Sequence, residues 1–317
     1  MSEPLVSILI PCFNAAQFVE ETIESALAQT HQALEIIAID DGSSDSTYDL
    51  LRRFQGRIQV ERQQNVGASI TRNRLIERAS GGWLQFLDAD DLLDPRAVEQ
   101  RLACARATDA NAVYSNWRKF SGDAGAREYR PAQMQPMAEV SEDAELATFT
   151  TFWAPPAAWL FEARLIRQAG GFRADLPVIQ DARLLQDCAH LGARFAFVDQ
   201  VLAAYREARS DSLSQRNRAQ FLHDCLLNAE QILERWQALG SLGEPRRVAV
   251  AACFDFVARG LFVRDPAGFE RAYSGLKRIN AITDHAWPRI AKRLKRVLGV
   301  RAATAVLRVL RRAPEGR

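Results

Sequence analysis

The sequence predicts an α/β protein, in which a mostly parallel sheet is flanked by helices and followed by a helical C-terminal appendage. Strand-like and helix-like segments alternate through the first half of the 317-residue chain, which is typical of parallel sheets. Val6–Pro11 is nearly continuous in apolar residues, as in a strand buried on both faces. From about Arg218 onward the strand signal disappears, and we expect only helices there.

The individual elements follow from local patterns in chain order. Apolar residues at helical spacing predict a helix over Gln17–Thr30, and Leu34–Ile39 is the second strand. Ser44 and Asp45 are typical cap residues for a helix that runs to about Phe54. The other expected elements are strands at Ile58–Glu61, Gly82–Leu87 and Ala112–Phe120, one or two strands within Phe195–Tyr205, and helices at Ala68–Ala79, from Pro95 and at Leu184–Leu191.

Composition and length fit an ordinary globular protein of two parts. Hydrophobic residues make up 48% and charged residues 25% of the chain. We expect a larger domain at residues 1–215 and a helical region at residues 216–317. Ser121–Asp143, rich in Gly, Ala, Pro and charge, is expected to form a long loop, which is typical of functional or disordered segments.

The cysteines and the N-terminal residues indicate the compartment. The five scattered cysteines form no CxxC or Cys/His cluster, which argues against a zinc site and favours a reducing compartment. The first residues lack the basic-then-apolar pattern of a signal peptide, and no apolar run is long enough to span a membrane. We therefore expect a cytoplasmic protein.

Two carboxylates, Asp88 and Asp90, follow the predicted strand Gly82–Leu87. In extended geometry residues i and i+2 point to the same side, so the two side chains can converge on one point. Carboxylate oxygens are the ligands that Mg²⁺ and Mn²⁺ prefer, with water and substrate phosphates completing the shell. By spacing alone, a metal site and a helix-capping acidic turn before Pro95 fit equally well.

Four other residues also stay open on local pattern alone. Asp40 and Asp41 follow a strand, where a carboxylate either accepts a hydrogen bond from a base or ribose or shapes a turn. Phe13, just past the first strand, fits a nucleobase platform or the core. Asp181, in a polar turn, fits a general base beside a reacting hydroxyl or a helix N-cap.

Motifs in a fixed order along residues 5–214 carry a family resemblance. They read VSILIPCFN, DDGSSDST, NVGAS followed by Arg72-Asn73, FLDADD, GGF, LPVIQD and AYREARSDSLS. The ordered set resembles the family 2 inverting glycosyltransferases of the Rossmann-like GT-A fold, especially the bacterial enzymes of surface-polysaccharide assembly. Each motif is weak by itself, whereas the ordered set is specific.

The resemblance implies a role for each matched position. Asp88 and Asp90 match the DxD motif, which binds Mn²⁺ or Mg²⁺ against the donor diphosphate. Asp181 matches the catalytic base, and Asp40 matches the carboxylate that bonds the edge of the nucleobase. The implied nucleotide-sugar site as a whole comprises Pro11, Phe13, Asn14, Asp40, Asp41, Asn65, Gly67, Arg72, Asp88 and Ala89.

The reaction that the resemblance implies is a single displacement. An acceptor hydroxyl attacks the anomeric carbon of a nucleotide-sugar, with UDP as the default nucleotide, and the configuration inverts. The expected acceptor is a saccharide or a lipid-linked saccharide. Nucleic acid is not an expected partner, because no basic patch with interleaved aromatic residues occurs outside the C-terminal segment.

Two alternative functions are disfavoured by particular residues. A nucleotidyltransferase usually has a Gly-rich, basic loop near the first strand, and PCFNAAQF contains neither Gly nor Lys. A non-catalytic nucleotide-sugar-binding assembly partner has no need of the carboxylates Asp88, Asp90 and Asp181 together.

One position departs from the family pattern. Many relatives carry a His after the Tyr-Arg pair near the end of the domain, where it helps to bind metal or phosphate. This chain has Ala208 there, with Arg209 beside it, and none of its four histidines lies in a matched motif. Because guanidinium binds phosphate well, Arg209 is a candidate substitute for that His.

Residues 288–312 predict a basic amphipathic helix. The segment contains nine Lys and Arg residues and no acidic residue, and its apolar residues recur at helical spacing. Such a helix can lie on an anionic membrane surface, or it can pack on the catalytic domain with its charges in water. A lipid-linked acceptor would make the first arrangement useful, and the protein would then work at the inner face of the cell membrane.

The membrane interpretation predicts that deleting the residues after Trp287 moves the protein from the membrane fraction to the soluble fraction, because the deletion removes the basic and apolar residues that would bind lipid. Fractionation of cells that express the full and the truncated chain checks this. Unchanged partitioning would favour the packed helix instead.

Overall fold

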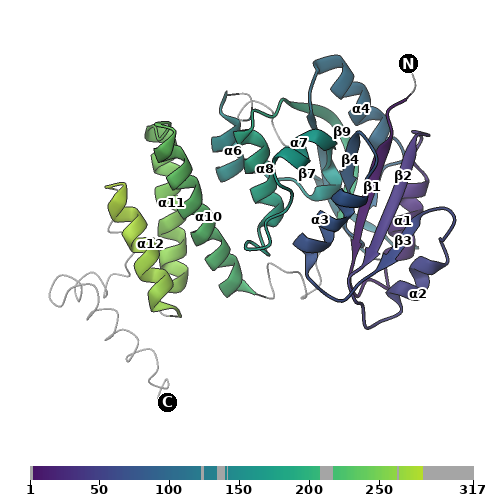
Figure 1. Cartoon of the computed structure of the whole chain (residues 1–317), viewed down its shortest axis with the longest axis horizontal. Coiled ribbons are helices and arrows are strands. Elements are labelled where there is room, and N and C mark those ends of the chain that lie inside the picture. The colour runs from purple at the N-terminus through teal and green to yellow at the C-terminus, as the bar shows by residue number, and fades with distance from the viewer. Residues whose placement is uncertain are drawn as a thin grey trace, which may run out of the picture. The chain divides into compact units, whose positions relative to one another are not determined.

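The computed structural model describes residues 3–122, 125–133, 140, 142–207, 217–262 and 264–280. The chain divides into two compact units, Met1–Arg209 and Ser210–Arg317. The described part of the first unit contains a sheet with helices, and that of the second unit is helical (Figure 1). Ala208, Arg209 and the basic segment 288–312 lie outside the described residues.

One mixed sheet organises the first unit. The strand order among the described residues is β3-β2-β1-β4-β8-β6-β9-β5, and β7 pairs with β6. β3, β2, β1 and β4 run parallel, as do β6 and β9, whereas β8 is antiparallel to β4 and β6, and β5 to β9. The strands are β1 (Val6–Cys12), β2 (Leu34–Asp40), β3 (Gln59–Arg62), β4 (Trp83–Phe86), β5 (Leu92–Leu93), β6 (Ala112–Ser121), β7 (Glu128–Gln133), β8 (Trp159–Glu162) and β9 (Phe195–Arg206).

Strand β1 lies at the centre of the parallel part of the sheet. Every residue of β1 except Pro11 is buried, because the strand pairs with β2 and β4 along its edges and α3 packs against it. Burying each Val, Leu or Ile side chain of this kind stabilises the fold by about 1.5–3 kcal/mol. In the β1–β2 register Cys12 lies opposite Asp40, so these two strands end side by side.

Helices connect the strands of the first unit. They are α1 (Val19–Leu27), α2 (Thr47–Arg52), α3 (Ala68–Arg78), α4 (Ala97–Thr108), α6 (Ala144–Thr150), α7 (Ala163–Gln168) and α8 (Gln180–His190), with a 3-10 turn η1 (Pro156–Ala158). α3 packs on β1 and β2, and α4 packs on β6 and β9 (Figure 1). The alternation of strand and helix predicted from the sequence is therefore confirmed, and the sheet becomes mixed beyond β4.

The segment Ser121–Asp143, predicted as a loop, contains the strand β7. β7 forms an antiparallel pair with the end of β6, in which Phe120 faces Tyr129. Its six residues are all exposed, so the strand lacks the alternation of apolar and polar residues that marks a half-buried strand. The loop prediction is therefore wrong for Glu128–Gln133.

The described part of the second unit consists of three helices. They are α10 (Arg218–Ala238), α11 (Glu244–Leu261) and α12 (Pro266–Arg278). α11 packs closely on α12, and a Cβ placed on Gly275 would lie 2.6 Å from the ring of Phe254. Among the described residues, no helix combines the length and the apolar character needed to cross a membrane.

Asn73 of α3 fixes the loop that follows α7. Its Nδ2 donates to the backbone oxygen of Phe172 at 2.8 Å, and its Oδ1 accepts from the backbone nitrogen of Phe172 at 2.7 Å. Gly171 has a φ of +70°, and a Cβ on Gly171 would collide with Oδ1 of Asn73. The two hydrogen bonds hold the Phe172 ring edge-on to Phe86, at a centroid distance of 5.0 Å.

We predict that Gly171→Ala lowers the free energy of unfolding by about 3 kcal/mol, since the left-handed conformation and the collision with Asn73 both disfavour the methyl group. The matched control is Gly170→Ala, because Gly170 has a φ of +80° and open space around its Cβ position. Its cost should be only about 1–2 kcal/mol of backbone strain. Thermal melting compares the two variants, and equal losses would show that the contact with Asn73 does not restrict this position.

Candidate active site

The carboxyl ends of the parallel strands place several predicted site residues at one edge of the sheet. β1 is followed by Phe13, β2 ends at Asp40, and Asp88 comes two residues after β4. Parallel strands end at the same edge, so these residues gather where open α/β sheets bind their ligands. Phe13 is 50% exposed and is therefore available to a ligand.

One carboxylate oxygen of Asp40 is buried without a hydrogen-bond partner among the described residues. Its side chain is fully buried, and Oδ2 pairs with Nε of Arg62 at 3.1 Å and accepts from the backbone nitrogen of Ser43 at 3.3 Å. Oδ1 is also buried, yet it accepts no hydrogen bond from any described residue. A buried acceptor of this kind is costly unless it is paired, so Oδ1 suits a ligand that donates an N–H group.

Asp41 shapes the neighbouring loop rather than facing a ligand directly. Oδ1 accepts from Nε2 of Gln63 at 2.7 Å and from the backbone nitrogen of Val66 at 3.0 Å. Oδ2 accepts from the backbone nitrogen of Gly67 at 2.9 Å. Gly67, at a φ of +91°, is the N-cap of α3. Asn65, within the same loop, remains exposed.

Asn14 joins the end of β1 to the turn after β2. Its backbone nitrogen donates to the Ser43 hydroxyl at 2.9 Å, and its Oδ1 accepts from the backbone nitrogen of Ser44 at 2.9 Å. Asn14 adopts a φ of +48°, a left-handed conformation that Asn tolerates better than most residues. The structure therefore gives Asn14 a turn-shaping contact, and Pro11 and Phe13 lie on either side of Cys12 in the same segment.

Arg72 connects the acidic residues of the site. Its guanidinium is buried, pairs with Oδ1 of Asp88 and lies 5.2 Å from the centroid of the Phe172 ring. Burial lowers the pKa of Arg72, but the carboxylates of Asp88, Asp181 and Asp91 outweigh burial, so the net pKa is raised. Arg72 is therefore held in its charged form.

The turn after Asp88 separates an exposed carboxylate from a buried one. Asp90 is exposed, Ala89 is buried, and Asp91 is fully buried. Oδ1 of Asp91 accepts from the backbone nitrogen of Arg206 at 2.8 Å. Burial, together with the charges of Asp90 and Asp88, raises the pKa of Asp91 well above its usual range. Asp88 and Asp90 can thus face a ligand, whereas Asp91 is buried and fixes the turn through its hydrogen bond to the backbone of Arg206.

Arg206 fixes this turn through contacts that no local sequence pattern predicts. Its Nε donates to the backbone oxygen of Asp90 at 2.9 Å, its Nη1 to that of Gly122 at 2.6 Å, and its Nη2 to Glu21 at 3.0 Å. The guanidinium also lies over the rings of Phe18 and Phe120, at 4.2 and 4.3 Å from their centroids. These contacts join segments that are far apart in the chain.

Asp181 lies in the first turn of α8. It is half-buried, and its Oδ2 accepts a hydrogen bond from the indole Nε1 of Trp153 at 2.9 Å. Burial raises the pKa of Asp181, and the Trp153 bond, the backbone N–H of Ala182 and the charge of Arg72 oppose this rise. A carboxylate with a raised pKa is a stronger base, as a proton acceptor needs to be.

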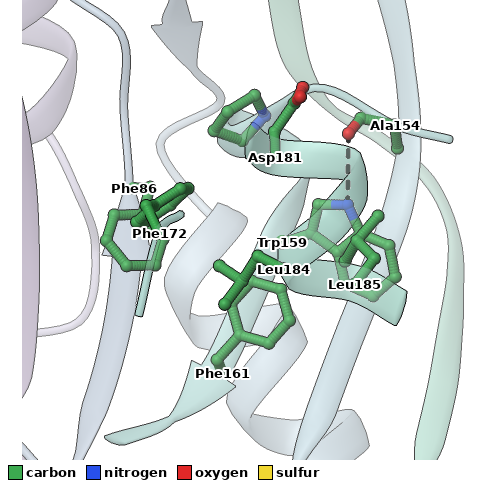
Figure 2. A pocket seen from close by; sticks show the side chains of 9 residues that line it. Phe86, Ala154, Trp159, Phe161, Phe172, Asp181, Leu184 and Leu185 are labelled. Atoms are coloured by element: carbon green, nitrogen blue, oxygen red, sulfur yellow. Dashed lines mark hydrogen bonds between the residues drawn. The ribbon is translucent and has the colours of Figure 1, made fainter. Parts of the chain in front are cut away.

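An apolar pocket lies beside Asp181 (Figure 2). Its lining residues are Phe86, Ala154, Pro156, Trp159, Phe161, Phe172, Asp181, Leu184 and Leu185. Figure 2 shows the Asp181 carboxylate pointing away from the side chains of Trp159, Phe161 and Leu184. The apolar side chains thus line the pocket, while the Asp181 carboxylate at its edge faces away from them.

The donor set fits a divalent cation only in part. Within the described residues, no group of three or more His, Cys, Asp or Glu side chains is arranged to hold a metal. Asp88 and Asp90 supply two carboxylates, and Oδ1 of Asp88 is already paired with Arg72. Mg²⁺ and Mn²⁺ are commonly bound by one or two carboxylates plus substrate phosphates, so the residues fit a cation that a bound diphosphate completes.

The family assignment rests on the N-terminal part of the chain. The family model described as glycosyl transferase family 2 matches residues 7–166, about half of the chain. The chain belongs to glycosyl transferase family 2. The matched part contains β1 from its second residue, β2, β4 and the Asp88–Asp90 turn, and it ends before Asp181.

Relatives and solved structures extend this similarity. A Bacillus subtilis (strain 168) protein named as a teichuronic acid biosynthesis glycosyltransferase, TuaG, is 39% identical over 104 residues. These residues are 32% of this chain and 41% of that protein, so the chain spans less than half of TuaG. Staphylococcus aureus TarS in complex with UDP-GlcNAc aligns with a TM-score of 0.65 at 16% identity, over 99% of this chain and 93% of that one.

A second solved structure supports the same fold. The mannosyltransferase PcManGT from Pyrobaculum calidifontis, in complex with GDP-Man and Mn²⁺, aligns with a TM-score of 0.52 at 18% identity. The alignment covers 98% of this chain and 88% of that chain. The GT-A fold predicted from the sequence is therefore confirmed.

We predict that Arg206→Leu lowers the free energy of unfolding by about 3 kcal/mol, because it removes the donor to the backbone oxygens of Asp90 and Gly122 and breaks the buried ion pair with Glu21. For a unit of this size the melting temperature should fall by about 6–12 °C. The matched control is Arg130→Leu, whose ion pair with Glu207 is exposed and should be worth less than about 1 kcal/mol. Similar losses in both variants would contradict the role assigned to Arg206.

Proposed function

We propose that this protein transfers a sugar from a nucleotide-sugar to an acceptor hydroxyl, with inversion at the anomeric carbon. The observation that carries the proposal is the arrangement around Arg72. Its guanidinium pairs with Asp88, and it lies near enough to Asp181 for that carboxylate, after Asp88, to help raise the pKa of Arg72. A carboxylate of the DxD motif and a candidate base are thereby placed in one electrostatic neighbourhood, as a transfer reaction requires. Membership of glycosyl transferase family 2 supports the same activity.

The nucleotide is proposed to bind at the ends of β1 and β2. Oδ1 of Asp40 accepts an N–H from the base edge, and Pro11 and Phe13 flank the base. Asp41 and Asn14 keep the surrounding loops in shape, while Asn65 and Gly67 form the next wall of the pocket. UDP is our default nucleotide, and the UDP-GlcNAc complex of TarS supports it.

The donor diphosphate is proposed to lie at the Asp88–Asp90 turn, which includes Ala89. Asp88 and Asp90 would hold Mn²⁺ or Mg²⁺ together with the phosphates, and the Mn²⁺ complex of PcManGT supports this choice. When bound, the cation neutralises the charge that grows on the departing diphosphate. Arg72 orients Asp88 through their ion pair, and Arg206 holds the backbone of Asp90.

Asp181 is proposed to act as the general base. It takes the proton of the acceptor hydroxyl while the hydroxyl oxygen forms a bond to the anomeric carbon. The bond from that carbon to the diphosphate oxygen breaks at the same time, and the diphosphate leaves with the electron pair. Attack from the face opposite the leaving group inverts the configuration. The raised pKa of Asp181 makes it better suited to accept the proton.

The acceptor is proposed to be a saccharide, free or lipid-linked, in the assembly of a surface polysaccharide. The name of TuaG, which refers to teichuronic acid biosynthesis, supports this class of product. Contact with the inner face of the membrane through residues 288–312 would suit a lipid-linked acceptor.

We predict that UDP or a UDP-sugar raises the melting temperature in the presence of Mn²⁺ or Mg²⁺ but not with EDTA. A ligand at about 100 times its Kd stabilises the folded state by about 2.7 kcal/mol. The screen includes GDP, dTDP and their sugars. Asp90→Ala should lose the metal-dependent shift, and Glu24→Ala, which removes an exposed carboxylate from α1, should keep it.

The donor found in this way then serves in a transfer assay on a panel of oligosaccharides, read by mass spectrometry. The wild-type protein should add one sugar mass to an acceptor, and Asp181→Asn should lose at least about a hundredfold in rate. No thermal shift with any nucleotide would contradict the donor site. Binding that is unaffected by Asp90→Ala would contradict the assigned metal ligands.

A further inference from the structure

A tryptophan is in direct contact with the proposed base. Trp153 lies between α6 and η1, and its Nε1 donates to Oδ2 of Asp181 at 2.9 Å. Its ring meets the rings of Trp117 and Tyr205 edge-on, at centroid distances of 5.7 and 6.2 Å. Because two aromatic neighbours restrict the indole, its N–H remains directed at the carboxylate.

We propose that Trp153 is a positioning residue for Asp181, holding Oδ2 so that Oδ1 is the oxygen presented to the acceptor hydroxyl. The inference rests on the proposed function, because it assigns a partner to the proposed base. The terminal torsion of an Asp side chain has a broad energy profile, so the carboxylate needs a donor to fix its plane. A general base must lie within about 2.6–3.2 Å of the proton-bearing oxygen, and a fixed plane maintains that geometry.

Other charged and polar groups also act on Asp181. Arg72 of α3 lowers its pKa, and Asp88, after β4, raises it. Burial is the main cause of the raised pKa of Tyr205 of β9, and the carboxylates of Asp91, Asp88, Asp90 and Asp181 raise it further. With these groups unchanged, loss of the indole N–H removes one hydrogen bond to the charged carboxylate, so the pKa of Asp181 should rise further.

Trp117 provides a matched control within the same aromatic cluster. It is buried, and it contacts both Trp153 and Tyr205. Its Nε1 makes no hydrogen bond with any described residue. Trp117→Phe therefore keeps an aromatic ring at the position beside Trp153 and removes an indole N–H that does not bond Asp181, whereas Trp153→Phe removes the N–H that holds the base.

The first readout does not depend on activity. In protein labelled with ¹⁵N at the tryptophan indoles, one Nε1–H resonance should shift as Asp181 titrates, and Trp153→Phe identifies it by its loss. Asp181→Asn should abolish that shift. If Trp153→Phe does not fold, the effect of Asp181→Asn on the indole resonances still tests the contact. If Trp153 does not donate to Asp181 in solution, no indole Nε1–H resonance will shift as Asp181 titrates.

The second readout is kinetic. Trp153→Phe should lower kcat by about tenfold, the loss expected when one hydrogen bond to a charged group is removed, and leave the KM for the donor unchanged. The acid limb of the pH profile of kcat should move to higher pH, because the base must lose its proton and its pKa has risen. Trp117→Phe should leave the KM, kcat and the pH profile close to the wild type.

The outcomes separate this inference from the proposed function. The positioning role would be overturned if Trp153→Phe kept wild-type kcat and KM and if Asp181→Asn left the pH dependence of every indole resonance unchanged. The transferase proposal would still stand if Asp181→Asn abolished transfer. Conversely, an indole resonance that follows Asp181 in a protein that transfers no sugar would support the Trp153 contact and overturn the function.

Discussion

The buried guanidinium of Arg72 is the charge on which the arrangement of the candidate site depends. A cation removed from water is stable only when carboxylates face it, so Asp88 must remain against it and Asp181 must stay nearby. The ring of Phe172 lies beside the same guanidinium, and Asn73 holds the backbone of Phe172 in place. The guanidinium of Arg72 therefore positions the carboxylates of Asp88 and Asp181 before any ligand binds.

The parallel strands add a second constraint to this one. β1, β2 and β4 end at one edge, and polar side chains connect the loops that follow β1 and β2. Asn14 bonds the turn after β2, and both oxygens of Asp41 accept from the loop that leads into α3. A pocket built from such loops is already shaped, which reduces the ordering that a ligand must impose on binding.

The sequence was sufficient to predict the residues whose position follows from a strand end. Asp40, Asp88 and Asp90 come directly after apolar segments, so their placement needs only the direction of the strands. Arg206 and Trp153 could not be found in this way. Arg206 bonds Glu21 across 185 positions of sequence, and Trp153 bonds Asp181 across 28. Hydrophobic periodicity within a short segment does not predict such long-range contacts. β7 was missed for another reason, because a fully exposed strand shows no hydrophobic pattern.

In the proposed nucleotide site, a base bound at the buried Oδ1 of Asp40 would be selected by its hydrogen-bond donors rather than by its size. Uracil, thymine and guanine carry a ring N–H on the pairing edge, whereas cytosine and adenine present a lone pair at the equivalent ring nitrogen. A buried acceptor left without a donor costs about 1–3 kcal/mol, which is roughly a ten- to hundredfold difference in affinity. The selectivity of such a pocket follows the hydrogen pattern of the base, so purine and pyrimidine donors of the same pattern can share one recognition element.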